Sequence, residues 1–215
     1  AQHSMLHTQY NTRLQAQGIA VDAILEGQEK RLFGIIRKVF SREFTLGITS
    51  ASEHITAIMA DCFVERPEIF ANADERIRAL YVWHAMEEME HKGVAYDVMQ
   101  DIAKVGYRTR ISSMLLVTIL FPYHVLRIMN HMLQVDGFSG WERTKIWAKG
   151  LWWLYKPGGI FMPMMGKYFS YLKPGFHPWQ EPVVASYEPW LKLLKETGNP
   201  VEAGNRLTAD ALARA

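Results

Sequence analysis

Apolar residues recur every three or four positions along most of the chain, which is the spacing of amphipathic helices. The spacing predicts helices over residues 1–17, 28–41, 43–65 and 74–104, and a weaker one after residue 199. Residues 19–27 and 66–73 lack it and are expected to be connections. Asn72 or Asp74 is expected to cap the helix that follows, and Gly106 to end it. The chain is therefore predicted to be all-α.

The middle of the chain is more apolar. Residues 111–126 hold no Asp, Glu, Lys or Arg, but sixteen residues with Pro122 among them are too short and too broken for a membrane span. We expect a buried helix or a segment that lies along a membrane surface. Residues 141–180 alternate aromatic residues with lysines, which suits either a membrane-facing surface or a large aromatic core covered by lysine stems. Between these two, the core is favoured.

Composition narrows the classes of protein. The 215 residues carry a net charge of +2, which gives no reason to expect a nucleic-acid partner. Cys62 is the single cysteine, so an internal disulfide and a cysteine-based zinc site are excluded. No signal peptide is visible, and a cytoplasmic location, with membrane association left open, is expected. We expect two parts, a metal-site bundle over 1–110 and an aromatic-rich helical extension over 111–215 packed on it.

The most informative stretch is Tyr81–Val98, inside the helix predicted for 74–104. Glu88 and His91 are three residues apart and share a helix face, and His84 lies one turn before Glu88. Glu87 is four residues before His91 and is an alternative to Glu88. Glu-x-x-His on one helix is an element of bundle di-metal sites, although a solvated face with an incidental histidine has the same pattern.

Two earlier helices add candidate ligands. His3 and His7 are four residues apart and share a face of the first helix, where two surface histidines are the alternative. Glu53 is surrounded by small residues that would let a helix or ligand come close. His54 points about 100° away from Glu53 and is expected either to support a ligand from behind or to be a core residue, rather than to be a ligand itself.

The order of these residues resembles the ferritin-like di-metal pattern of Glu, Glu-x-x-His, Glu and Glu-x-x-His on four successive helices. Glu53 supplies the third item, and Glu88 with His91 supplies the fourth. His3 would end the second item, so the pattern requires an N-terminal helix before Ala1. We therefore expect a ferritin-like bundle with additional C-terminal helices and a missing N-terminal helix.

The chain also resembles a bacterial family known as predicted metal-dependent hydrolases. The resemblance rests on residues 3–11, 52–57, 83–98 and 174–179, and the Glu-His-Lys-x-Val-Ala-Tyr-Asp run over 90–97 is its strongest part. It implies a metal site built from Glu and His residues. The metal ligands expected from helix order and resemblance together are His3, His7, Glu53, Glu88 and His91.

Three functions compete. The favoured one is a di-iron enzyme that uses dioxygen to oxidise a hydrophobic small molecule, with two ions in the complete protein. The second is a hydrolase in which a bound divalent metal generates hydroxide from water. Glu87 and His84 are the candidate catalytic groups, with Glu90 as an alternative general base. The third is a membrane-associated binding or scaffold protein. Peripheral membrane contact and a homodimer are both open.

Overall fold

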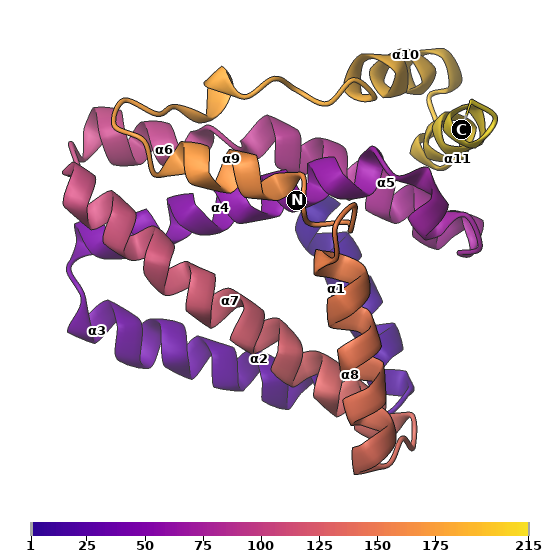
Figure 1. Cartoon of the computed structure of the whole chain (residues 1–215), viewed down its shortest axis with the longest axis horizontal. Helices are drawn as coiled ribbons and strands as arrows, with labels where there is room; N and C mark the ends of the chain where they lie inside the picture. Colours follow the sequence, from indigo (N-terminus) through magenta and orange to yellow (C-terminus); the bar gives the residue numbers. More distant parts are fainter. Residues whose placement is uncertain (1, 215) are drawn as a thin grey trace.

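The protein is described by a computed structural model of residues 2–214, apart from the side chains of residues 2 and 3. Over this range it contains helices and no strand, as the apolar spacing predicts (Figure 1). The helical elements are α1 (Gln2–Ala16), α2 (Val21–Glu29), η1 (Lys30–Ile36), α3 (Arg37–Val39), α4 (Arg42–Val64), η2 (Pro67–Phe70), α5 (Glu75–His91), α6 (Val94–Asp97), η3 (Val98–Ile102), α7 (Tyr107–Val135), α8 (Gly140–Tyr155), α9 (Met164–Tyr171), η4 (Pro178–Gln180), α10 (Tyr187–Thr197) and α11 (Pro200–Leu212).

Helix α4 is the centre of the fold and packs against α5, α7 and α9. Its N-terminus is capped by Ser41, whose side chain accepts a hydrogen bond from the Phe44 backbone. Small residues let α7 come close: a Cβ on Gly47 would lie 2.4 Å from Ser113 Oγ. The close approach of the two backbones therefore depends on glycine at that position.

Two apolar clusters lie on different sides of α4. One joins α4 and α5 to α10 and α11, and includes Ala57, Ala60, Val82, Ala85, Met86, Met89, Trp190 and Leu207. The other joins α4 to α6, α7 and α9, and includes Ala51, Ile55, Tyr96, Met99, Met114, Val117, Tyr171 and Phe176. Both clusters contain residues of α4, so this helix and its partners fix the position of α5.

The predicted connection over 19–27 is wrong. Residues from Val21 to Val39 form one helical run through α2, η1 and α3, with π-type turns in the middle. A tertiary contact fixes its start, because the Ala20 N–H donates to His131 Nε2 on α7 at 3.0 Å. Sequence spacing could not reveal a cap that lies on a distant helix.

The single helix predicted for 74–104 is interrupted at Lys92 and Gly93. A Cβ on Gly93 would lie 2.4 Å from Trp179 Nε1, so Trp179 of η4 packs directly against the backbone at Gly93. Asp74 caps α5, as predicted, by accepting a hydrogen bond from the Arg76 N–H. Gly106, expected to end the helix, instead precedes the first residue of α7.

Residues 111–126 are part of a longer helix than expected, and Pro122 does not break it. α7 continues through Pro122 for 29 residues, and it is long and apolar enough to cross a membrane, by length and composition only. Within its most apolar window, 17% of the residues are buried. The aromatic core predicted for 141–180 is found only in part. Phe161 and Tyr171 are buried, but no residue of α8 is, and Trp141 and Trp152 are 68% and 65% exposed.

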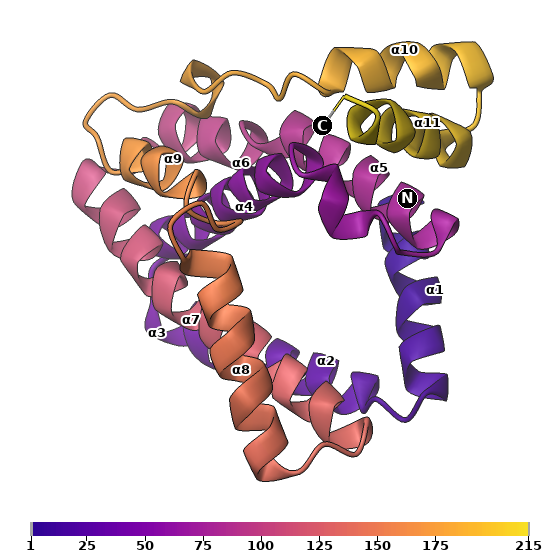
Figure 2. The ribbon, with the colours of Figure 1, turned by 45° about the vertical axis from the view of Figure 1, so that its right-hand side comes forward.

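The views agree on how these elements are arranged. α4, α5, α6 and α9 form one layer, with α10 and α11 at one end of it, whereas α7 runs out of this layer diagonally (Figures 1 and 2). α2 lies along the outer part of α7, α3 leads from there toward the start of α4, and α8 folds back beside α7 (Figure 1). α1 connects this outer group to the α5 end of the layer (Figure 2).

Candidate metal centre

The Glu88 carboxylate joins two helices. Its side chain on α5 is 12% exposed, and its Oε1 lies 3.3 Å from Nε2 of His84, one turn earlier on the same helix. Its Oε2 accepts a 2.6 Å hydrogen bond from the Thr56 hydroxyl on α4. Each carboxylate oxygen therefore has a polar partner in a nearly buried position, as carboxylates in protein interiors require.

A third helix reaches the same place through His7 of α1. The rings of His7 and His84 are edge to face, with centroids 5.1 Å apart. Both histidines line a cavity of about 280 Å³ between α1 and α5. The other lining residues are Leu6, Tyr10, Asn11, Leu14, Leu80, Tyr81 and Trp83. A small molecule in this cavity would therefore contact the histidine that holds Glu88.

Glu53 and His91 are placed by the register of α4 against α5. The two helices are antiparallel (Figure 1), and Thr56 lies opposite Glu88. A step of three residues back along α4 leads to Glu53, and the same step forward along α5 leads to His91. Since each step is about 4.5 Å of helix rise, Glu53 and His91 lie at the same level of the bundle. Glu53 is half-buried and His91 is exposed.

The described side chains do not complete a metal site. Among them, no group of three or more His, Cys, Asp or Glu residues lies closely enough together to hold an ion. The His3 side chain, a predicted ligand, lies outside the described residues. The ferritin-like arrangement of two Glu-x-x-His elements is not confirmed. Glu90 is directed elsewhere, because its Oε1 accepts a 2.7 Å hydrogen bond from the Tyr187 hydroxyl on α10.

The donor types nevertheless suit a divalent ion. Carboxylate oxygen and imidazole nitrogen are ordinary ligands of zinc and iron, and Glu88 and His84 are already in contact. Thr56 is a contributor that the sequence did not reveal. Its hydroxyl is positioned to orient Glu88, a role that outer partners commonly have around metal ligands. The sequence signal that could have identified Thr56 is its position three residues after Glu53, on the same face of α4. Glu87 is half-buried on the same helix.

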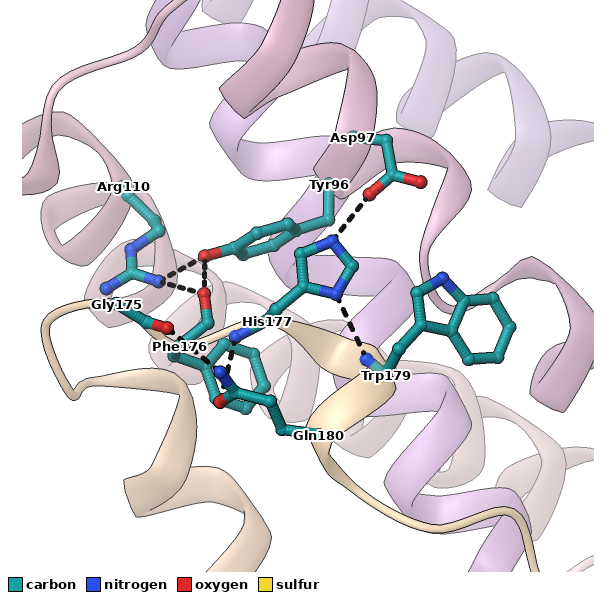
Figure 3. A network of polar contacts seen from close by, with 8 residues as sticks. All are labelled: Tyr96, Asp97, Arg110, Gly175, Phe176, His177, Trp179 and Gln180. Atoms are coloured by element: carbon teal, nitrogen blue, oxygen red, sulfur yellow. Dashed lines mark hydrogen bonds and ion pairs between the residues drawn. The ribbon is translucent and has the colours of Figure 1, made fainter.

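The strongest family motif turns out to hold the loop that follows α9. Tyr96 and Arg110 both bond this loop. The Tyr96 hydroxyl donates to the Phe176 carbonyl (Figure 3). Arg110 donates to the Lys173 carbonyl at 2.6 Å. Asp97 lies 2.8 Å from His177 Nε2, and His177 Nδ1 accepts a hydrogen bond from the Trp179 backbone. His177 is therefore a structural residue of this loop.

Lys92, the third residue of the motif, is buried at 5% exposure. Its ammonium group donates to the Glu181 carbonyl at 2.8 Å and lies 5.0 Å from the centre of the Trp179 ring. The motif over 90–97 and the segment over 174–181 are thus in direct contact. The resemblance that suggested a metal site includes residues that maintain the fold beside it.

His54 is a core residue, as predicted. Its Nε2 lies 3.3 Å from the Lys167 carbonyl, and burial lowers its pKa to about 4, so the ring is neutral at pH 7. Lys167 also pairs with Asp61 on α4. Burial raises the pKa of Asp61, although the Lys167 ammonium acts in the opposite direction. This partly buried pair lies on another face of α4 and is separate from Glu88.

Comparison with known proteins finds a family whose match includes the candidate ligands. A family model described as "Predicted metal-dependent hydrolase" matches residues 1–182, the part of the chain from α1 to the loop after η4. No curated protein matches the chain, and neither does any solved structure. The matched part includes Glu53, Glu88 and His91 and leaves out α10 and α11. The chain therefore belongs to the family described as predicted metal-dependent hydrolases.

Proposed function

We propose that the protein is a metal-dependent hydrolase whose metal ion is held beside Glu88. The observation that carries the proposal is the position of this carboxylate, nearly buried and bonded to Thr56 and His84 from two helices. A nearly buried carboxylate with a fixed direction is suited to be one ligand of a divalent metal ion. The family description supplies the reaction class.

The proposed ligands are Glu88, Glu53 and His91, with His3 and His7 from α1. The equal level of Glu53 and His91 across the α4–α5 interface supports their inclusion, and the ring contact of His7 with His84 supports the approach of α1. When bound, the ion would supply Lewis-acid activation of water and of the bond to be cleaved.

The remaining groups have separate roles in this proposal. Thr56 fixes the direction of the Glu88 carboxylate through its hydrogen bond. His84 lines the cavity next to Glu88, so it is placed to donate a proton to the leaving group. Glu87 is the candidate that accepts a proton from water. Trp83 and Leu80 give the cavity an apolar wall, which suits a hydrophobic small molecule.

Hydrolysis is better supported than oxidation by two iron ions. The family description names hydrolysis and says nothing of oxidation. A di-iron site of the ferritin-like type would also need a further Glu and a second Glu-x-x-His element. Identity and number of the metal ions remain part of the proposal, and iron and zinc both suit the donor types.

The test is hydrolysis of a panel of chromogenic esters by protein stripped of metal and then supplied with zinc, manganese or ferrous iron. The proposal predicts that chelation abolishes turnover, that one of the ions restores it, and that Glu88→Gln abolishes the restoration. An oxygen electrode records the ferrous sample in parallel. Substrate-dependent oxygen uptake without hydrolysis would overturn the proposal in favour of oxidation.

A further inference from the structure

A second cavity adjoins the first and is larger. It encloses about 420 Å³ between α1, the start of α5 and the start of α11. Leu6, Tyr10, Leu80 and Trp83 line both cavities, so one ligand could extend through the two. The volume is within the range of small-molecule sites, and most of the lining is apolar.

The charged residues that line this larger cavity are both basic. Arg13 on α1 and Arg76 on α5 line it, and no acidic residue does. Among the described residues, neither guanidinium is in an ion pair. Met5 and Val201, also in the lining, are exposed apolar side chains that a bound molecule would cover. An apolar wall with two arginines favours a molecule that is apolar along most of its length and anionic at one end.

Helix geometry gives the length of such a molecule. Arg76 and His84 are eight residues apart on α5, which is about 12 Å along the axis. Arg13 and His7 are six residues apart on α1, or about 9 Å. The anionic end and the group that reacts are therefore expected to be about 9–12 Å apart.

We propose that the substrate is an amphiphilic ester with an anionic end, held by Arg13 and Arg76, while its ester bond reaches His84 and Glu88. This inference rests on the proposed hydrolase function. In the reaction, water adds across the ester: its oxygen joins the acyl carbon, the bond from that carbon to the alcohol oxygen breaks, and that oxygen takes a proton. The products are an acid and an alcohol, one of which keeps the anionic end.

Binding of decanoate to metal-free protein tests the anion site without any turnover. Calorimetric titration, below the micelle concentration, is made against wild type, Arg76→Met and Arg13→Met, with 1-decanol as the uncharged probe. We expect decanoate to bind one site, and each substitution to weaken it about tenfold because a charge-assisted contact is lost. Decanol is expected to bind wild type more weakly and to be insensitive to either substitution.

Two controls separate specific binding from general attraction. Arg108→Met removes one exposed arginine that does not line the cavity, so decanoate binding should be unchanged. Val201→Trp fills the cavity and should abolish binding of both probes. The inference is overturned if decanol binds as tightly as decanoate, or if Val201→Trp leaves decanoate binding intact. Loss of ester hydrolysis in Glu88→Gln with decanoate binding retained would separate this result from the proposed function.

A second observation stands apart from the cavities. The outer group of helices exposes large apolar side chains between basic ones. Residues 30–42 hold five basic residues and no acidic one, and Phe33, Ile35, Val39 and Phe40 are exposed among them. The neighbouring helices α7 and α8 also expose large apolar side chains, namely Leu115, Ile119, Leu120, Tyr123, Trp141, Trp152 and Trp153. α8 lies against α7, since Trp147 and Leu151 share a cavity with Tyr123 and Leu126.

We infer that this surface, formed by residues 30–42, α7 and α8, binds an anionic lipid bilayer peripherally. Tryptophan and tyrosine favour the membrane interface, and basic residues favour anionic headgroups. A two-fold contact with a second copy is less favourable, because it would bring two identical basic patches together. The charge of the surface therefore selects lipid over a second copy.

Flotation with vesicles tests this inference. Phosphatidylcholine vesicles are compared with vesicles that also contain phosphatidylserine, using wild type, a Lys30→Gln/Arg31→Gln/Arg37→Gln/Lys38→Gln variant and Trp152→Ser/Trp153→Ser. We expect wild type to bind only the anionic vesicles, both variants to lose binding, and a Lys192→Gln/Lys195→Gln control on α10 to keep it. Binding to neither vesicle, or a wild-type dimer in light scattering that Trp152→Ser/Trp153→Ser dissociates, would overturn the inference.

Discussion

Thr56 on α4 donates a 2.6 Å hydrogen bond to Glu88 on α5, and this contact fixes the carboxylate on which the metal proposal depends. The hydroxyl holds one carboxylate oxygen and so gives the carboxylate a defined direction, with the other oxygen 3.3 Å from His84 Nε2. It also sets the register of the two helices, which brings Glu53 level with His91.

Thr56→Val removes the hydroxyl and keeps the shape of the side chain. We expect zinc affinity to fall about tenfold, because outer partners of metal ligands commonly contribute at this level. Calorimetric titration measures it. Thr49→Val on the same helix, whose hydroxyl bonds the Thr45 carbonyl of its own helix, is the matched control and should bind zinc like wild type. Equal affinity of Thr56→Val and wild type would show that the bond does not orient a ligand.

Gly93→Ala should destabilise the fold because the added Cβ would lie 2.4 Å from Trp179. Overpacking of this kind lowers the free energy of unfolding by about 1–3 kcal/mol, as urea titration would show. Trp179→Leu in the same chain should recover part of the loss by opening space. Gly166→Ala has nothing within 4 Å of the new Cβ, and in a helix it should be neutral or slightly stabilising. A Gly93→Ala variant as stable as Gly166→Ala would contradict the close contact.

Arg110→Met should release the loop over 173–181. The buried guanidinium donates to the Lys173 carbonyl and to Tyr96, so the substitution leaves buried polar atoms without partners. The expected cost is about 3 kcal/mol of unfolding free energy, since each such group costs about 1–3 kcal/mol. Limited proteolysis should also begin in this loop. Arg108→Met, an exposed arginine on the same helix, should change neither measurement.

Stability should fall between pH 6.5 and pH 4 through His54. Its pKa is about 4 in the folded chain and 6.5 as the ordinary value, so in this window the unfolded chain binds the additional proton. The contribution of His54 to the free energy of unfolding is fully present above pH 6.5 and is lost as the pH falls toward 4. One unit of pKa corresponds to about 1.4 kcal/mol, and the loss should approach about 3 kcal/mol near pH 4.

His54→Gln retains a donor for the Lys167 carbonyl and removes the titration. The difference in unfolding free energy between the two proteins, measured by urea titration at several pH values, isolates this histidine from Asp61, whose raised pKa acts in the opposite direction. If the difference is the same at pH 4 and pH 7, the histidine does not titrate as described.

The sequence was informative where a local signal was present. Helix spacing predicted α1, α4 and the start of α5 within a few residues, and Asp74 was identifiable as a cap. The break at Gly93 and the start of α2 depend on Trp179 and His131, which are distant in the chain, so no local pattern carried them. The exposed tryptophans of α8 have the composition of a core, and only the fold shows that nothing described covers them.

The site was predictable to a similar extent. Shared-face spacing placed His84 beside Glu88, which the structure confirms. Thr56 was not predicted, because a threonine has no metal signature and its partner is on another helix. The signature over 90–97 suggested chemistry, whereas Lys92, Tyr96 and Asp97 hold the loop after α9. Motif residues for the fold and for the site cannot be separated until both are placed in space.

Zinc titration of wild type, Glu88→Gln and Glu90→Gln tests the central claim most directly. The two glutamates are two residues apart on α5, but Glu90 bonds Tyr187 on α10, so its substitution is a matched control. We predict that Glu90→Gln binds zinc like wild type, and that Glu88→Gln loses at least about a hundredfold in affinity, because a first ligand is removed rather than an outer partner. Equal affinity of Glu88→Gln and wild type would contradict the account.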